Sequence, residues 1–266
     1  GDSLELNSEY IEYSGTTKLA IAKRKVELEN NESILRTDSL FFDRQKQEVY
    51  YQTTGEITSE DTVIRSQSGT YVVDDKKYEF ISDVVVTDPS FTIFSQQMDY
   101  YTEVRHAYFY GATTIHGEGY DVYCNRGFFD SNLKKGYFQD RATVDYNLRN
   151  IKGDSIYFDD HIQYAAATRN VQISDTIGNN VICGEFGEVF KFKDSAIVTQ
   201  NPVAIKLVDS DSLYIHADTL LATGPAENRI LTGYYGVRIY KTNLSGVSDS
   251  IPVSYTHLTL PTMDSV

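Results

Sequence analysis

The residues with the clearest capacity for chemistry lie in the block GDSIYFD at positions 153–159. A serine that follows Gly-Asp can act as a nucleophile, and related blocks occur as GDSL at positions 1–4 and TDSLFFD at positions 37–43. Such a serine needs a histidine base, which in this class of hydrolase usually follows an aspartate by three residues, and none of the five histidines does. We therefore predict that the chain is not an enzyme. The hydrolase alternative requires that Ser155→Ala abolish ester cleavage.

Metal-binding patterns are equally weak. The two cysteines, Cys124 and Cys183, lack the close spacing of a zinc site. The acidic stretch VDSDSLYIHAD at positions 208–218 lacks the glycine and the final glutamate of a calcium-binding EF-hand loop. The DDH sequence at positions 159–161 falls in a polar turn between strands. We expect neither a metal nor a cofactor.

The composition favours strands over helices. The chain of 266 residues contains 21 tyrosines and 13 phenylalanines but only 5 prolines, and aromatic and β-branched residues suit half-buried pleated surfaces. The formal net charge of −14 repels phosphate backbones, so we expect no nucleic-acid partner. Because the chain lacks an initiator methionine and begins within a pattern, we expect an internal fragment or a mature product.

The elements that carry these residues form repeats of about thirty residues. One repeat contains Leu35 and Thr37, then a one-residue shift in phase, then Leu40 and Phe42. Strand side chains alternate between two faces, so the apolar set would turn outward after the shift unless a β-bulge absorbs the extra residue. The TDS and GDS blocks fall at this shift, which explains their recurrence without catalysis. The positions equivalent to Leu40 are Leu4, Tyr71, Met98, Gly127, Ile156, Gly187 and Leu220.

These repeats predict an all-β fold in which about eight two-strand repeats form one domain over residues 1–250. Stacked repeats bury a continuous apolar interior that one repeat alone cannot bury. The segment IPVSYTHLTLPTMDSV at residues 251–266 breaks the pattern. We expect it to be a disordered tail or foreign sequence.

The repeat resembles that of the OstA-like family. One half of the motif is small-Asp-x-apolar-x-aromatic-Asp at positions 153–159, and the other half is A-x-x-N-V-x-I at positions 167–173. The segments YFYGATTI and LYIHADTL are most similar to the long OstA-like proteins of Bacteroidetes-type bacteria. The family includes LptA, the periplasmic bridge protein of lipopolysaccharide transport, and the N-terminal domain of its outer-membrane partner LptD.

The resemblance implies an elongated open β-jellyroll, or β-taco, whose apolar trough holds the lipid A acyl chains of lipopolysaccharide. It implies a non-enzymatic transport module between the inner and outer membranes, located in the periplasm or associated with the outer membrane. Other Lpt-type β-jellyroll proteins would join it by edge-strand addition. The alternative is a structural β-solenoid or adhesin with a dry, filled core. The expected trough-lining residues are Leu40, Phe42, Tyr51, Tyr71, Val73, Phe80, Met98, Tyr100, Phe109, Phe129, Phe138, Ile156 and Phe158.

Overall fold

The computed structural model describes residues 5–29, 33–175, 180–208, 211–225 and 228–254. Within these ranges it contains 22 β-strands and no α-helix, which confirms the all-β prediction. The first strands are β1 (Glu5–Asn7), β2 (Tyr10–Ser14), β3 (Leu19–Glu29), β4 (Ile34–Asp43), β5 (Glu48–Tyr51), β6 (Gly55–Ser59), β7 (Thr62–Ser66), β8 (Ser68–Val72), β9 (Lys77–Asp88), β10 (Phe91–Tyr101), β11 (His106–Gly117) and β12 (Tyr120–Asp130). The later strands are β13 (Lys135–Tyr146), β14 (Arg149–Asp159), β15 (Tyr164–Asp175), β16 (Asn180–Phe190), β17 (Ser195–Thr199), β18 (Val203–Val208), β19 (Asp211–His216), β20 (Thr219–Thr223), β21 (Ile230–Lys241) and β22 (Leu244–Ser254).

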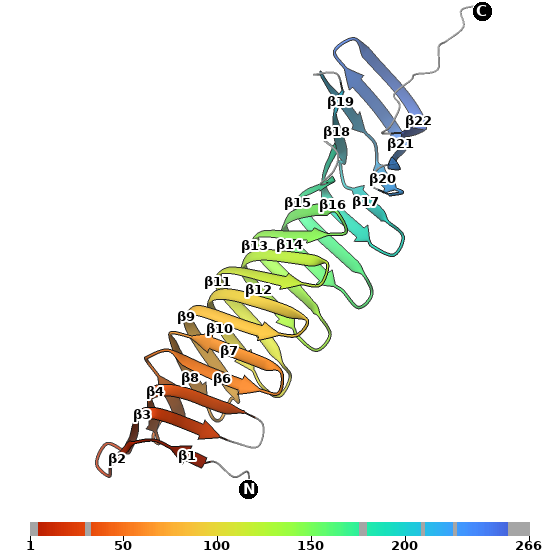
Figure 1. Ribbon diagram of the computed structural model, residues 1–266. Helices are drawn as coiled ribbons and strands as arrows, with labels where there is room; N and C mark the ends of the chain where they lie inside the picture. Colours follow the sequence, from red (N-terminus) through yellow and green to blue (C-terminus); the bar gives the residue numbers. More distant parts are fainter. Residues whose placement is uncertain (1–4, 30–32, 176–179, 209–210, 226–227, 255–266) are drawn as a thin grey trace, which may run out of the picture. The chain divides into compact units, whose positions relative to one another are not determined.

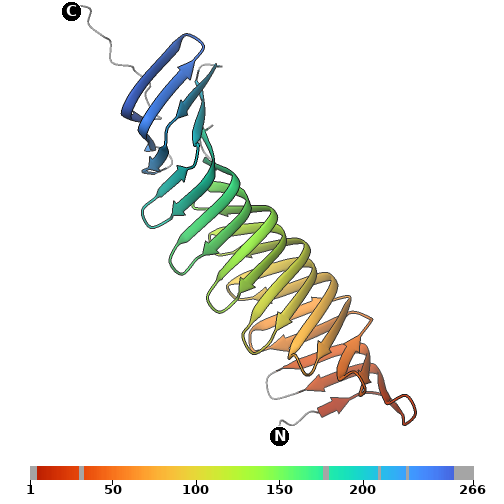
Figure 2. The same cartoon turned by 180° about the vertical axis from the view of Figure 1, so that it is seen from behind.

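The chain divides into two compact units, residues 1–140 and 141–266. The single repeat domain over residues 1–250 stays a prediction. Within each unit, long strands that follow one another along the chain lie side by side (Figures 1 and 2). They pair antiparallel, as β9, β10, β11 and β12 do in the first unit and β14, β15 and β16 do in the second. This order follows from the short polar turns between successive strands.

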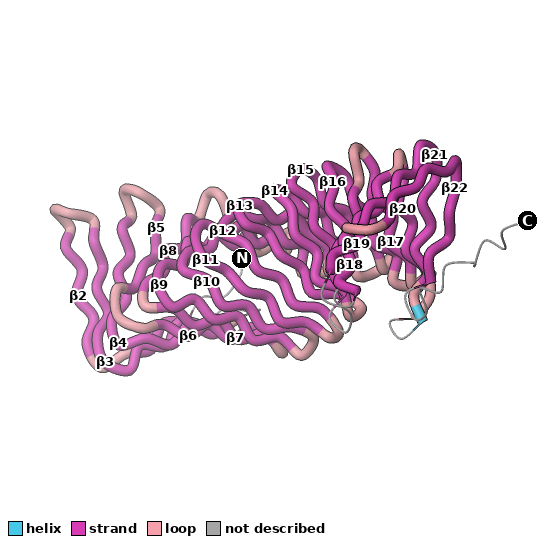
Figure 3. The backbone as a smooth tube through the Cα atoms, turned by 90° about the horizontal axis from the view of Figure 1, so that it is seen from above, coloured by secondary structure: helices cyan, strands magenta, loops and turns pink. Residues whose placement is uncertain are grey.

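Each long strand contributes one half to each of two layers. In the first unit, β4 pairs with β6 through residues 34–37 and with β5 through residues 41–43. In the second unit, β16 pairs with β18 through residues 180–183 and with β17 through residues 186–190. We call layer A the one that contains β6 or β18, and layer B the one that contains β5 or β17. The turns lie at the ends of the strands (Figure 3).

The bend between the layers is the phase shift predicted from the sequence. In β14 the register with β15 shifts between Lys152 and Ser155, so the Asp-Ser of the GDS block lies at the irregularity. On the partner strand, Arg169 and Asn170 both have positive φ, at 59° and 51°. Two successive left-handed residues turn the strand sharply, which carries it from one layer to the other.

The turns between the strands repeat regularly along the chain. A turn residue with positive φ recurs every 29 residues, at Lys18, Gln47, Lys76, Arg105, Lys134 and Gln163. The register of the bends also corrects one part of the repeat alignment. Gly69 pairs with Phe80, as Met98 does, so Gly69 rather than Tyr71 occupies the position equivalent to Leu40. The count of eight repeats stays a prediction.

The first four residues of the predicted tail belong to a strand. Residues 251–254 form the end of β22, where Ile251 pairs with Gly233 and Val253 with Leu231. Val253 is buried, at 7% exposed, so this segment contributes to the packed interior. The remainder of the predicted tail, residues 255–266, lies outside the described residues, as does the GDSL block at 1–4.

Candidate functional site

Large apolar side chains fill the interior of the first unit. Phe80, Met98 and Phe129 are 0% exposed, and Phe109 is 1% exposed. Phe91 in layer A packs its ring edge-on against Phe129 in layer B, with ring centroids 5.5 Å apart and an angle of 82° between the planes. The two layers therefore meet in direct apolar contact.

Most of the predicted lining residues face this interior or the corresponding interior of the second unit. The buried members are Leu40, Tyr51, Phe80, Met98, Phe109, Phe129, Phe138, Ile156 and Phe158. Phe42, Tyr71 and Tyr100 are half-buried. Val73 lies outside the interior, because β8 ends at Val72 and Val73 is 36% exposed in the following turn. The alternation that places a residue inward does not continue into a turn.

The half-buried residues cluster at the turn end of layer B. Tyr71 and Tyr78 have ring centroids 4.6 Å apart, and the ring of Tyr78 stacks on Phe80 at 5.3 Å. Burial raises the pKa of the Tyr78 hydroxyl well above its usual value. Tyr78 was absent from the predicted lining set, although its two-residue spacing from Phe80 places it on the same face. This end of layer B is therefore more accessible than the centre of the interior.

The bend between the layers is closed by small residues and paired hydroxyls. Ser95 Oγ lies 2.8 Å from Thr113 Oγ1 within the buried bend. Tyr51 Oη lies 2.6 Å from Ser66 Oγ, and a Cβ at Gly69 would lie 2.6 Å from the Tyr51 ring. Glycine therefore leaves the space that the tyrosine ring occupies, and the buried hydroxyls find partners, as burial requires.

Small residues in the second unit permit tight packing. Ala165 and Ala167 in layer B are 0% exposed, and Gly187 lies beside them. A Cβ at Gly187 would lie 2.8 Å from Val171 Cγ1 and 3.0 Å from Ile173 Cδ1, both in layer A. Small residues on an inward face are compatible with either close packing or room for a ligand. At Gly187 the space is taken by side chains of the facing layer.

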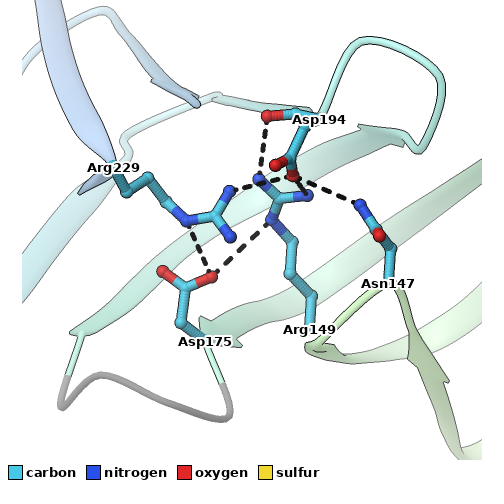
Figure 4. A network of polar contacts seen from close by, with 5 residues as sticks. All are labelled: Asn147, Arg149, Asp175, Asp194 and Arg229. Carbon is cyan, nitrogen blue, oxygen red and sulfur yellow. Dashed lines mark hydrogen bonds and ion pairs between the residues drawn. The ribbon is translucent and has the colours of Figure 1, made fainter. Parts of the chain in front are cut away.

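A charged cluster joins the two layers of the second unit (Figure 4). Arg149 begins β14 and pairs with Asp175 at the end of β15, in layer A. Asp194 directly precedes β17, and Arg229 directly precedes β21, both at the end of layer B. Arg149 Nη1 lies 3.1 Å from Asp194 Oδ1, and Arg229 Nε lies 3.0 Å from Asp175 Oδ1. Asp194 Oδ1 also lies 3.3 Å from Arg229 Nη1 and accepts a hydrogen bond from Asn147 Nδ2 at 3.2 Å.

Burial makes these charges depend on one another. The Arg149 and Arg229 side chains are 1% and 2% exposed, against 10% for Asp175 and 35% for Asp194. Desolvation lowers the pKa of the Arg149 guanidinium, although both aspartates oppose this shift. Desolvation likewise raises the pKa of Asp175. Removing one partner from such a buried set typically costs about 3–5 kcal/mol, because it leaves a charge uncompensated.

The cluster borders a small cavity with polar and apolar sides. Arg149, Asp175 and Asn180 line the polar side. The apolar lining consists of Ile173, Ile182, Ala196 and Ala222. Among the residues that the structure describes, Asn180 Oδ1 is buried without a hydrogen-bond partner. Arg149 Nη1 meets the Asp194 carboxylate at ion-pair distance without hydrogen-bond geometry. The polar groups at this point are therefore incompletely satisfied.

The sequence pattern missed this cluster. Arg149 and Asp175 continue the inward alternation of Ile151 and Ile173, and that parity is the signal that could have found them. Asp194 and Arg229 lie outside strands and carry no periodic signal.

The GDS block at residues 153–155 has a structural position. Ser155 lies in β14 opposite Thr168, at the register shift. The described residues contain no group of three or more His, Cys, Asp or Glu side chains placed to hold a metal ion. They also include no helix with the length and apolarity needed to cross a membrane.

Comparisons with known proteins give a family match and a similar solved structure. Residues 1–96 match the family model of the OstA-like protein. No curated protein has a significant match to the chain. Among solved structures, the chain is similar to LptH, described as the LptA homologous periplasmic component of the conserved lipopolysaccharide transport device from Pseudomonas aeruginosa. That similarity has 12% sequence identity and a TM-score of 0.37, and covers 40% of this chain and 80% of LptH. The resemblance to the OstA-like family is thus confirmed by the family match over residues 1–96.

Proposed function

We propose that this chain is a non-enzymatic module of lipopolysaccharide transport that acts in the periplasm, between the inner and outer membranes. In this role it shields lipid A acyl chains between its two β-layers. The observation that carries the proposal is the row of inward apolar residues in successive strands, in a chain whose residues 1–96 match the OstA-like family. Transport of this kind requires shielding rather than catalysis.

Shielding is the main physical requirement for moving such a lipid through water. Each methylene group gains about 0.8 kcal/mol when it leaves water, so an unshielded lipid with several acyl chains faces a large barrier. An interior of interchangeable Phe, Tyr, Leu, Ile and Val side chains offers apolar contact without a fixed docking position. A lipid could therefore slide along it without being trapped.

The first contact with an acyl chain is proposed at the half-buried residues Phe42, Tyr71 and Tyr100, because they are inward-facing and accessible in the first unit. Fully buried residues such as Met98 and Phe129 would touch lipid only after the layers separate, since both are 0% exposed. Entry of an acyl chain would thus replace contacts between the two layers with contacts between each layer and the lipid.

The experiment is site-specific photo-crosslinking in intact cells with a benzophenone amino acid at Phe42. Phe41, the neighbouring residue, is the matched control. Its side chain lies on the outward face, where its ring stacks on that of Tyr50 with the centroids 5.0 Å apart. We expect lipopolysaccharide adducts at Phe42 and few at Phe41. Equal labelling of the two positions, or no labelling of either in folded protein, would contradict the proposal.

A structural repeat protein with a dry core is the second candidate. Full burial of Phe80, Phe138 and Ile156, each 0% exposed, favours it, because the described interior is packed by the chain itself. The same experiment separates the candidates, since a permanently filled core forms no lipid adducts at any inward position. Phe158, also 0% exposed, provides a second inward test position.

Partners are proposed to be other β-jellyroll proteins that add a strand beside β2. Strand β2 pairs with β3, yet its inward-parity side chains Ile11 and Tyr13 are 56% and 52% exposed. The exposed apolar face of β2 would be covered by an added strand of a partner.

A further inference from the structure

The charged cluster of the second unit lies where the ends of the two layers meet, which we call the mouth. Arg149 and Asp175 extend the inward alternation of layer A one step beyond Ile151 and Ile173, so their side chains point between the layers (Figure 4). Asp194 reaches the same place from a turn of layer B. The ion pair between Arg149 and Asp194 and the one between Arg229 and Asp175 therefore both cross the mouth.

A second contact closes the mouth beside the cluster. Lys191 Nζ, from the turn after β16, lies 4.8 Å from the ring centroid of Tyr146 at the end of β13. Tyr146 is 1% exposed, so its ring is covered at this point. An acyl chain that enters here must first separate these contacts.

Asp194 is the member of the cluster that can leave most easily. Its side chain is 35% exposed and lies in a turn, whereas Asp175 is 10% exposed at the end of a strand. One oxygen of Asp194 serves both arginines, at 3.1 Å and 3.3 Å. Rotation of this carboxylate into solvent would therefore break both of its ion pairs together. Two contacts would remain: the hydrogen bond from Arg149 Nη2 to the Asp194 main-chain carbonyl oxygen at 3.2 Å, and the ion pair between Arg229 and Asp175.

The net charge of the four side chains decides which molecule can enter once Asp194 has rotated away. Two arginines and two aspartates are neutral together, but without Asp194 one positive charge stays buried and unpaired. Such a charge is costly to bury, so the open state is disfavoured until another anion takes the place of the carboxylate. A neutral molecule cannot supply this compensation.

We propose that Arg149 and Arg229 form a binding site for the phosphate headgroup of an acyl-bearing amphiphile, which Asp194 occupies as a resident carboxylate until the ligand arrives. This inference rests on the proposed function and adds to it a condition for opening. An amphiphile opens the mouth of the second unit only when it carries an anion.

The chemistry of the cavity fits such a ligand. Guanidinium groups bind phosphate oxygens through paired, charge-assisted hydrogen bonds, which Arg149 Nη1 and Arg229 Nε lack in the closed state. The apolar side of the cavity, which includes Ile173 and Ala222, continues directly from the charged side. A phosphate at the arginines would thus place the attached hydrocarbon toward the interior.

The test uses the full chain and isothermal titration calorimetry with three probes. These are a monoacylglycerol phosphate below its micelle concentration, the neutral monoacylglycerol of equal chain length, and inorganic phosphate. The variants are Asp194→Asn, on the exposed turn, and Arg229→Gln. The matched controls are Asp154→Asn and Arg169→Gln, which make the same charge changes at an exposed pair 3.7 Å apart in the same unit. Circular dichroism shows which variants are folded.

We expect the unmodified chain to bind the phosphate amphiphile at least tenfold more tightly than the neutral one. Asp194→Asn should strengthen binding of the phosphate amphiphile about tenfold without affecting the neutral one, because the resident anion is gone. Arg229→Gln should remove the preference, and both controls should behave like the unmodified chain. If either variant does not fold, the comparison of the phosphate amphiphile with the neutral one on the unmodified chain decides.

The proposal fails if both amphiphiles bind equally, or if Asp194→Asn leaves binding of the phosphate amphiphile unchanged or weaker. Equal affinity for inorganic phosphate and the phosphate amphiphile would show a free-anion site and overturn the headgroup assignment. Crosslinking at Phe42 together with equal binding of both amphiphiles would retain the proposed function and reject this site. The absence of both crosslinking and amphiphile binding would reject both.

Discussion

Replacing Phe129 with alanine removes a ring that joins the two layers of the first unit. Phe129 is 0% exposed, and its edge-to-face contact with Phe91 spans 5.5 Å between ring centroids. Truncation of a buried phenylalanine costs about 3–5 kcal/mol, which includes the cavity left behind. An aromatic pair contributes about 0.5–1.5 kcal/mol beyond its buried area, and truncation removes this contact too. We therefore expect a cost in the upper part of that range, about 4–5 kcal/mol. The void cannot close unless one layer moves toward the other.

The assay is urea titration followed by hydrogen exchange of the amides in β10, β11 and β12. Local exchange is preferable to a global midpoint, because repeat proteins can unfold in parts. Phe94→Ala is the matched control, since Phe94 lies on the same strand as Phe91 and is 46% exposed. It should cost less than about 1 kcal/mol. Equal costs for the two substitutions would refute the reasoning that the layers pack through Phe129.

The remaining predictions concern single polar groups. Thr113→Val removes the hydroxyl 2.8 Å from Ser95 Oγ and should lower the free energy of unfolding by about 1–2 kcal/mol. Thr114→Val, on the opposite face of the same strand, is the control and should change it by less than about 0.5 kcal/mol. Urea titration measures both. Burial raises the pKa of the Cys124 thiol to about 12, so iodoacetamide at pH 8 should alkylate it only after denaturation, as mass spectrometry would show; rapid alkylation of folded protein would contradict this. Desolvation raises the pKa of Asp88, but hydrogen bonds from neighbouring hydroxyls outweigh it and leave the pKa below its usual value. The stabilising contribution of the Asp88 carboxylate is therefore present above the unfolded pKa of about 3.9 and is lost as the pH falls through the folded pKa. The difference in unfolding free energy between the unmodified chain and Asp88→Asn should thus shrink at acid pH. A difference independent of pH would argue against this account.

The sequence alone determined the strands and the parity of most interior residues. Apolar residues must leave water, and strand geometry sends alternate side chains to opposite faces. Leu40, Met98 and Ile156 could therefore be assigned to the interior, on the far side of a phase shift that the structure realises as a bend. The GDS block could be read as part of that bend because it recurred.

Positions without an apolar signal were harder to assign. Gly69 occupies the inward position equivalent to Leu40, but glycine has no side chain to appear in an apolar pattern, and Tyr71 was chosen instead. Val73 was expected to face the interior because it lies two residues after Tyr71. The strand ends at Val72, however, and the alternation of side chains does not extend into the turn. In both cases hydrogen-bond register, rather than hydrophobicity, sets the answer.

Only the tertiary structure decided which strand ends meet. Arg149, Asp194 and Arg229 are far apart in the sequence, and two of them lie outside strands, so no local period connects them. Their contacts depend on the bend of each strand, which brings the ends of layers A and B together within the second unit. Buried charges are stable only with partners that compensate them, and folding of the layers is what supplies those partners.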